Sequence, residues 1–174
     1  DTPGHASHHF CVWDERTRGW FTGDTFGLSY RNLDTENGAF IFPTTTPIQF
    51  DPPALIDSIG RLMEREPERI YLTHFGCVRD VERLSRDLVE GVRQFARWGE
   101  EFEKHEDRSA RIRSAMMAWL VEGAREHGVE LPDDRLRFID GLVTAVRLGS
   151  TGQVGDCLSQ VDASFRHAYQ LHRF

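Results

Sequence analysis

The spacing of apolar residues changes near residue 80, and this change restricts the chain to a mixed architecture. Upstream, short apolar runs between turns predict strands, and a helical period follows Pro53 and stops before Pro67. The strands predicted in this part cover residues 10–13, 19–22 and 69–73. The helices predicted downstream, where apolar positions recur at helical spacing, cover residues 78–104, 112–120, 136–149 and 154–168. We therefore predict an α+β fold with two parts, residues 1–80 and a helical C-terminal region over residues 81–174.

Composition excludes several classes of function. The 174 residues are 39% apolar and 28% charged, which allows one domain, or one and a half, with a real hydrophobic core. The formal net charge is -7, and an acidic chain is a poor partner for nucleic acid or an anionic membrane. No apolar run approaches the roughly 20 residues that span a bilayer. Three widely spaced cysteines suit a reducing compartment, so we expect a cytoplasmic protein that binds neither nucleic acid nor membranes.

Histidines and one aspartate gather where the predicted strands begin or end. His5, His8 and His9 precede the first strand, Asp24 follows the second, and His74 follows the third. Imidazole and carboxylate together are ligands for zinc, manganese or iron. Strand ends fix the direction of such ligands, so this cluster is the strongest chemical signal in the chain.

The residues around this cluster resemble three metal motifs of the metallo-β-lactamase-fold hydrolases. The matching stretches are residues 2–9, 21–25 and 72–76, in the order of the family's third, fourth and fifth motifs. The resemblance covers residues 1 to about 80 and implies that His5 binds a first metal, Asp24 bridges two metals and His74 binds the second. It also implies that His9 lies beside the site and hydrogen bonds a ligand. The role of His8 stays open.

The chain departs from that family in one large respect. The family's His-x-His-x-Asp-His motif occurs nowhere in the 174 residues. Without it each metal would have two ligands, which is too few for a tight site, and half of the αββα sandwich would be missing. We therefore expect the second half of a metallo-β-lactamase αββα sandwich followed by a C-terminal helical subdomain. The missing N-terminal half of the same fold is then an expected partner, and the absence of an initial methionine fits this expectation.

The resemblance implies a dinuclear hydrolase that acts on a small-molecule substrate. Two divalent ions, zinc first and iron or manganese next, would hold a bridging hydroxide that attacks an ester, thioester, lactone, amide or phosphoester. The segment after Asp24 offers candidates to line the substrate pocket, namely Phe26, Tyr30, Arg31 and Phe42. The C-terminal helices would cover the pocket mouth or form a homodimer interface.

Two other functions stay open. One is an iron-dependent redox enzyme on the same scaffold, of the sulfur dioxygenase or oxygen reductase type. The other is a non-catalytic half-domain whose helices mediate assembly. Cys77, three residues after His74, is expected to be a small buried thiol, although it could approach the metals.

Overall fold

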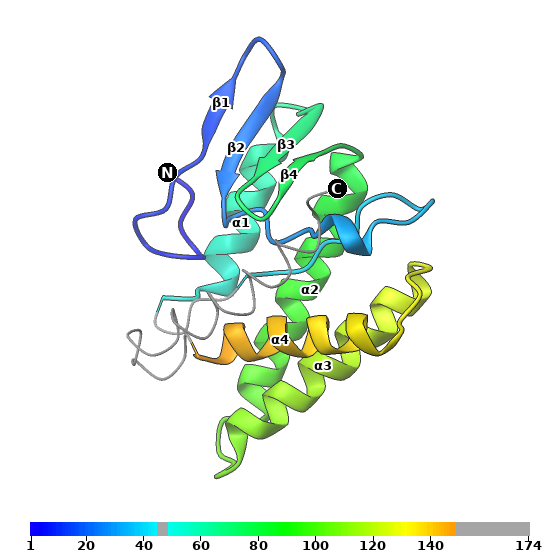
Figure 1. Ribbon diagram of the computed structural model, residues 1–174. Helices are drawn as coiled ribbons and strands as arrows, with labels where there is room; N and C mark the ends of the chain where they lie inside the picture. The colour runs from blue at the N-terminus through cyan, green and yellow to red at the C-terminus, as the bar shows by residue number, and fades with distance from the viewer. Residues whose placement is uncertain (45–48, 149–174) are drawn as a thin grey trace.

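Four short strands form a single mixed sheet in the order β1-β2-β3-β4. The computed structural model describes residues 1–44 and 49–148. The strands are β1 (Val12–Asp14), β2 (Gly19–Gly23), β3 (Arg69–Leu72) and β4 (Gly76–Val78). β1 pairs with β2, and β3 with β4, as antiparallel neighbours, whereas β2 and β3 are parallel (Figure 1). The carboxyl ends of β2 and β3 therefore meet at one edge of the sheet.

Four α-helices and one short 3-10 helix complete the described structure, so the predicted α+β class is confirmed. They are η1 (Arg31–Leu33), α1 (Pro52–Met63), α2 (Val81–Glu101), α3 (Arg108–Glu126) and α4 (Asp133–Leu148). α1 begins where expected because the Asp51 carboxylate accepts the Ala54 backbone N–H at 3.1 Å. Pro52 and Pro53 occupy its first two positions, where a missing N–H leaves no hydrogen bond unmade. No described helix is long and apolar enough to cross a membrane.

Strand β4 was not predicted, and it shortens the first helix of the second half. The expected helix over residues 78–104 begins at Val81, because residues 76–78 pair with β3. Asp80 adopts a left-handed backbone with φ of 58° between the two elements. The helix predicted over residues 154–168 lies outside the described residues.

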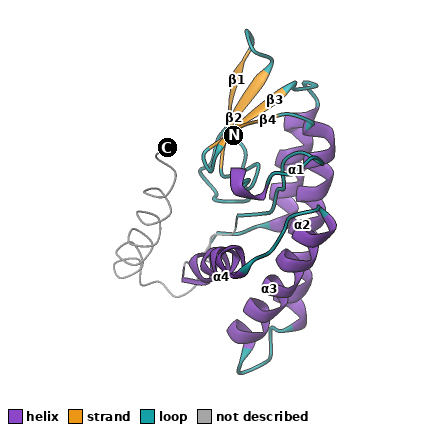
Figure 2. Cartoon of the chain, turned by 45° about the vertical axis from the view of Figure 1, so that its right-hand side comes forward, coloured by secondary structure: helices purple, strands orange, loops and turns teal. Residues whose placement is uncertain are grey.

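α1 and α2 cover one face of the sheet, and no described helix covers the other (Figure 2). Ile70, Leu72 and Val78 point to the covered face and pack on Leu55, Ile59 and Leu62 of α1 and on Leu84, Leu88 and Val92 of α2. Their alternate neighbours point the other way. The cross-strand pairs Val12–Phe21, Phe21–Tyr71 and Tyr71–Cys77 form a row across all four strands on the uncovered face.

A second core joins the loop after β2 to the helical region. Leu28, Tyr30 and Phe42 from the loop pack with Phe95 and Trp98 at the end of α2. α3 and α4 complete this core through Met116, Leu120, Ile139 and Val143. Because α2 takes part in both cores, the helices are packed directly against the loop that follows Asp24. The predicted boundary at residue 80 stays a prediction.

Candidate metal centre

Three loops bring His5, Asp24 and His74 together at the carboxyl edge of β2 and β3. Nε2 of His5 lies 3.4 Å from one carboxylate oxygen of Asp24, Oδ2. Nε2 of His74 lies 3.8 Å from the other oxygen, Oδ1. One imidazole therefore faces each oxygen of a single carboxylate, which is the arrangement expected of a carboxylate that bridges two metals.

The loop that holds His5 is fixed against α1. Thr2 donates its backbone N–H to the carbonyl of His9 at 2.8 Å, which closes the loop on itself. Gly4 has φ of +129°, and a methyl group there would lie 2.3 Å from the Leu55 backbone. Glycine is required at this position because both the conformation and the close approach exclude a side chain. Ser58 of α1 also donates to the Pro3 carbonyl at 2.7 Å.

The hydrogen bonds of Thr44 determine which nitrogen of His5 carries a proton. Its hydroxyl donates to the Asp24 carbonyl at 2.8 Å and therefore accepts from Nδ1–H of His5 at 3.0 Å. Burial lowers the pKa of His5, although the Asp24 carboxylate opposes the shift, so the imidazole is neutral near pH 7. Nε2 of His5 then presents a lone pair to a carboxylate oxygen. Two electron-pair donors at 3.4 Å are complementary to a cation.

His9 contacts the backbone of Asp24. Its Nε2 accepts the Asp24 backbone N–H at 3.2 Å, so Nδ1 carries the proton and donates to the Thr25 hydroxyl at 3.0 Å. Burial lowers the pKa of His9, which keeps it neutral in this role. His9 is thus placed to orient Asp24, whereas the side chain of His8 is exposed.

A methyl group at Gly23 is expected to displace His9. Gly23 has φ of +51°, and a Cβ there would lie 2.6 Å from Nε2 of His9. Loss of a hydrogen-bond partner that orients a ligand typically weakens metal binding about 10- to 100-fold, and we expect this loss for Gly23→Ala. Zinc titration against a competing chelator measures the effect. Gly60→Ala is the matched control, because a Cβ at this α1 position meets nothing within 4 Å; equal affinities for both variants would contradict the assignment.

Two buried polar atoms in the cluster have no hydrogen-bond partner among the described residues. They are Oδ1 of Asp24 and Nδ1 of His74. A buried acceptor without a partner is costly, and a bound cation would satisfy the carboxylate oxygen. The donor set therefore fits metal ions in chemistry. It is short in number, because no group of three or more His, Cys, Asp or Glu side chains suited to a metal occurs among the described residues.

The four pocket candidates lie in different environments. Phe26 is fully buried in the core beneath the sheet, and Phe42 is buried in the second core, so packing is the role that the structure shows for both. Arg31 is exposed and bonded to Ser29 and Asp34. Tyr30 is linked to the cluster through one residue, because its ring packs on Phe75, the neighbour of His74. Their role in a pocket stays a prediction.

Tyr30 is expected to remain protonated far above neutral pH. Burial, with the nearby Asp24 charge, raises the pKa of Tyr30 to about 12. Since the phenol pKa is about 10 in an unfolded chain, this group contributes stability below pH 10 that is lost as the pH rises toward 12. Ultraviolet absorbance measures the ionisation. Tyr30→Phe should remove the change that develops near pH 12, and an unaltered titration curve would contradict the placement of Tyr30.

Cys77 was expected to be buried, and the structure corrects this expectation. It is exposed on the uncovered sheet face, because it alternates with the buried Val78 along β4. Sequence reasoning also missed Thr44, whose hydroxyl touches both His5 and Asp24. A threonine in a proline-rich loop carries no local signal for that role.

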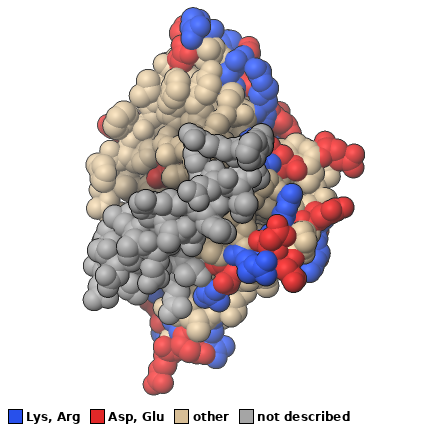
Figure 3. Space-filling view, in the orientation of Figure 1, with Lys and Arg blue, Asp and Glu red and all other residues tan. Residues whose placement is uncertain are grey.

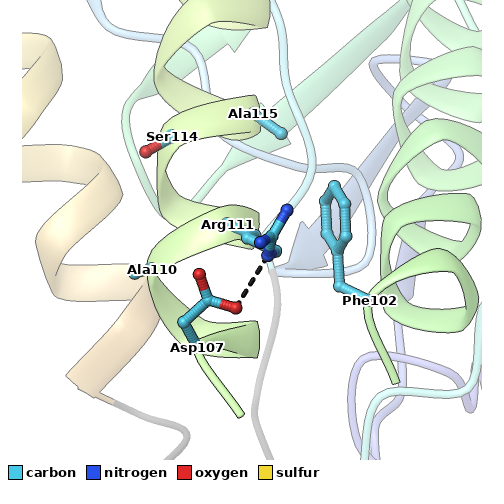
Figure 4. A pocket seen from close by; sticks show the side chains of 6 residues that line it. All are labelled: Phe102, Asp107, Ala110, Arg111, Ser114 and Ala115. Carbon is cyan, nitrogen blue, oxygen red and sulfur yellow. Dashed lines mark hydrogen bonds and ion pairs between the residues drawn. The ribbon is translucent and has the colours of Figure 1, made fainter. Parts of the chain in front are cut away.

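A cavity of ≈ 560 Å³ lies at the turn between α2 and α3, away from this cluster (Figure 4). It is lined by Phe102, Asp107, Ala110, Arg111, Ser114 and Ala115. The Arg111 guanidinium is bonded to Asp107 at 2.7 Å. None of the predicted site residues lines this cavity, so it is separate from the metal cluster.

The comparison with protein families agrees with the motif resemblance. Residues 1–74 match the family model of the metallo-beta-lactamase superfamily. A solved archaeal metallo-beta-lactamase superfamily protein from Sulfolobus tokodaii is 23% identical, with a TM-score of 0.40, over 72% of this chain. The match covers 44% of that protein, so the chain spans less than half of its length. No curated protein matches the chain.

Proposed function

We propose that residues 1–74, which match the family model of the metallo-beta-lactamase superfamily, form part of a dinuclear metal-dependent hydrolase. The observation that carries the proposal is the Asp24 carboxylate, whose two oxygens each face Nε2 of one histidine. His5 and Asp24 would hold one ion, and Asp24 and His74 the other. His and Asp ligands suit zinc first and iron or manganese next. Bound ions of this kind supply Lewis acidity and lower the pKa of water.

The residues of this chain hold and orient the site. Asp24 would fix the separation of the two ions, and His9 holds its backbone through the 3.2 Å hydrogen bond. Thr44 fixes the proton of His5 on Nδ1, so Nε2, which faces Oδ2 of Asp24, is the nitrogen that would bind a metal. Such partners preserve the direction of each ligand. We propose that an ester, thioester, lactone or related bond is the one held against the site.

The uncovered sheet face supports the proposal that a partner layer completes the site. Val12 and Phe21 are 51% and 50% exposed, and Phe21 stacks on Tyr71 with ring centroids 4.4 Å apart. Figure 3 shows few charges over this part of the sheet, whereas charged side chains gather at the hairpin tip and over the helices. An apolar sheet face is normally covered by a second layer. We assign this face to the first half of the same fold, which would supply the remaining ligands.

A groove on that face leads to the metal cluster. Its volume is ≈ 380 Å³, and it is lined by Phe21, Gly23, Tyr71, Leu72, Thr73, Gly76 and Cys77. Gly23 and Thr73 directly precede Asp24 and His74 in the chain. A layer that packs on this face and fills the groove would therefore reach the side of Asp24 and His74, where it could supply the remaining ligands. We call this chain together with that layer the complete protein.

Hydrolysis assays on the metal-loaded complete protein test the proposed function. We expect turnover of at least one ester, thioester or lactone, loss of turnover on chelation and recovery on adding zinc. Iron content together with oxygen uptake, and no hydrolysis, would favour the redox enzyme instead. Absence of both activities would leave a non-catalytic assembly role. A cytoplasmic location, suggested by three separate cysteines, and a homodimer through the C-terminal helices are further parts of the proposal.

A further inference from the structure

Three aromatic rings form a continuous series of contacts beside His74. The ring of Phe75 lies 5.2 Å from the His74 imidazole, and the ring of Tyr30 lies 5.5 Å from Phe75. Phe138 of α4 contacts Tyr30 with ring centroids 5.1 Å apart. All three contacts are edge-on. We call Phe75, Tyr30 and Phe138 the aromatic wall; it extends from the metal cluster to the helical region.

Backbone contacts hold the members of the wall in place. Ser29 donates its N–H to the His74 carbonyl at 2.8 Å, and Phe75 donates to the Ser29 carbonyl at 3.1 Å. These bonds join the loop that carries Tyr30 to the end of β3. The Arg135 guanidinium of α4 donates to the Asn32 carbonyl, which places Phe138 against the same loop. The wall is therefore built into the scaffold.

The chemistry of the wall is apolar, although it adjoins a polar site. Phe75 is 39% exposed while Tyr30 behind it is buried. The cation next to Tyr30 in the loop, Arg31, is paired with Asp34 at 3.1 Å, which reduces the charge that it offers to an anionic group. A polar centre next to an apolar wall is typical of sites that bind the reacting bond at the polar centre and an apolar substituent of the substrate on the wall.

We infer that the hydrolase site selects substrates with an uncharged, apolar acyl group, and that this group packs on the aromatic wall, with Phe138 of α4 as a specificity-determining residue. The inference rests on the proposed function. It assigns a role in substrate selection to the helical region, which contributes no proposed metal ligand among its described residues. Phe138 acts only by binding the apolar acyl group. The kcat/KM for substrates without a long apolar acyl group should therefore not change when Phe138 is replaced.

Two esters with the same leaving group test the inference on the metal-loaded complete protein. We expect kcat/KM for p-nitrophenyl octanoate to exceed that for the acetate. In Phe138→Ala this preference should fall about tenfold or more, while the acetate value stays within about twofold, since pocket contacts to methylenes carry such factors. Phe138→Leu keeps apolar surface and should retain most of the preference.

Phe40→Ala is the matched control. Phe40 is a half-buried phenylalanine that packs against the same second core. Its ring contacts Phe42 and His127, which are not members of the aromatic wall. We expect it to lower thermal stability as Phe138→Ala does and to leave the ester preference intact. A wild-type preference that survives Phe138→Ala, or falls equally in Phe40→Ala, overturns the inference and leaves the proposed hydrolase intact. A wild-type protein that hydrolyses neither ester overturns the inference, and failure on every ester, thioester and lactone overturns the proposed function as well.

Discussion

Asp24→Ala is expected to lower the hydrolytic kcat/KM of the metal-loaded complete protein by about 10³-fold or more. Lewis-acid stabilisation by metal ions is worth several kcal/mol, and each 1.4 kcal/mol is about a factor of ten in rate. Both ions would depend on this carboxylate, because its two oxygens face His5 and His74 at 3.4 and 3.8 Å. Initial rates over a range of substrate concentrations measure the loss.

Asp57→Ala is the matched control for this prediction. Asp57 is an exposed carboxylate on α1, and it lies outside the metal cluster. Removing it changes the net charge of the chain by the same amount, so an effect of charge alone would appear in both variants. We expect Asp57→Ala to keep nearly the full rate. Activity of Asp24→Ala within tenfold of the wild type would contradict the bridging role.

Phe21→Ala is expected to destabilise the complete protein by about 3–5 kcal/mol. This is the usual cost of truncating a buried phenylalanine. In the described chain Phe21 is 50% exposed, and its ring has Tyr71 as a stacking partner. The large value follows only if a second layer covers the sheet face and buries the ring completely. Equilibrium unfolding in denaturant gives the free energy of unfolding.

Phe102→Ala provides the comparison. Phe102 is a half-buried phenylalanine directly after α2. It lines the cavity of Figure 4, away from the sheet. A layer on the sheet would leave it half-buried, so we expect a cost of about 1 kcal/mol. Equal small losses for both variants would show that Phe21 stays at the surface, which would contradict the partner layer.

Local patterns predicted the elements that carry the site. The hairpin of β1 and β2 follows from two short apolar runs around a charged turn, and α1 follows from its apolar period and its proline start. The motif resemblance named His5, Asp24 and His74, and the structure brings the three together. Their role as metal ligands stays a prediction; Asp24 directly follows β2, His74 comes two residues after β3, and His5 lies in the loop before β1.

Contacts between segments far apart in the chain could not be predicted from the sequence. β4 is three residues long, and its pairing with β3 competes with the helical period that begins beside it. Thr44 reaches His5 and Asp24 only because the loop after β2 returns to the cluster. Phe138 of α4 meets Tyr30 although α1, α2 and α3 lie between them in the chain. Phe26 was a pocket candidate because a loop without a period gives no sign of which apolar side chains are buried.

Metal analysis of the complete protein tests the central claim, that Asp24 joins two metal ions, most directly. The measurement is the number of bound metal ions per chain in the wild type and in Asp24→Ala after equal dialysis. The account predicts about two ions per chain in the wild type and fewer than about one in the variant, since both ions lose a ligand. Two ions retained by Asp24→Ala, or none bound by the wild type after loading with zinc, iron or manganese, would contradict it.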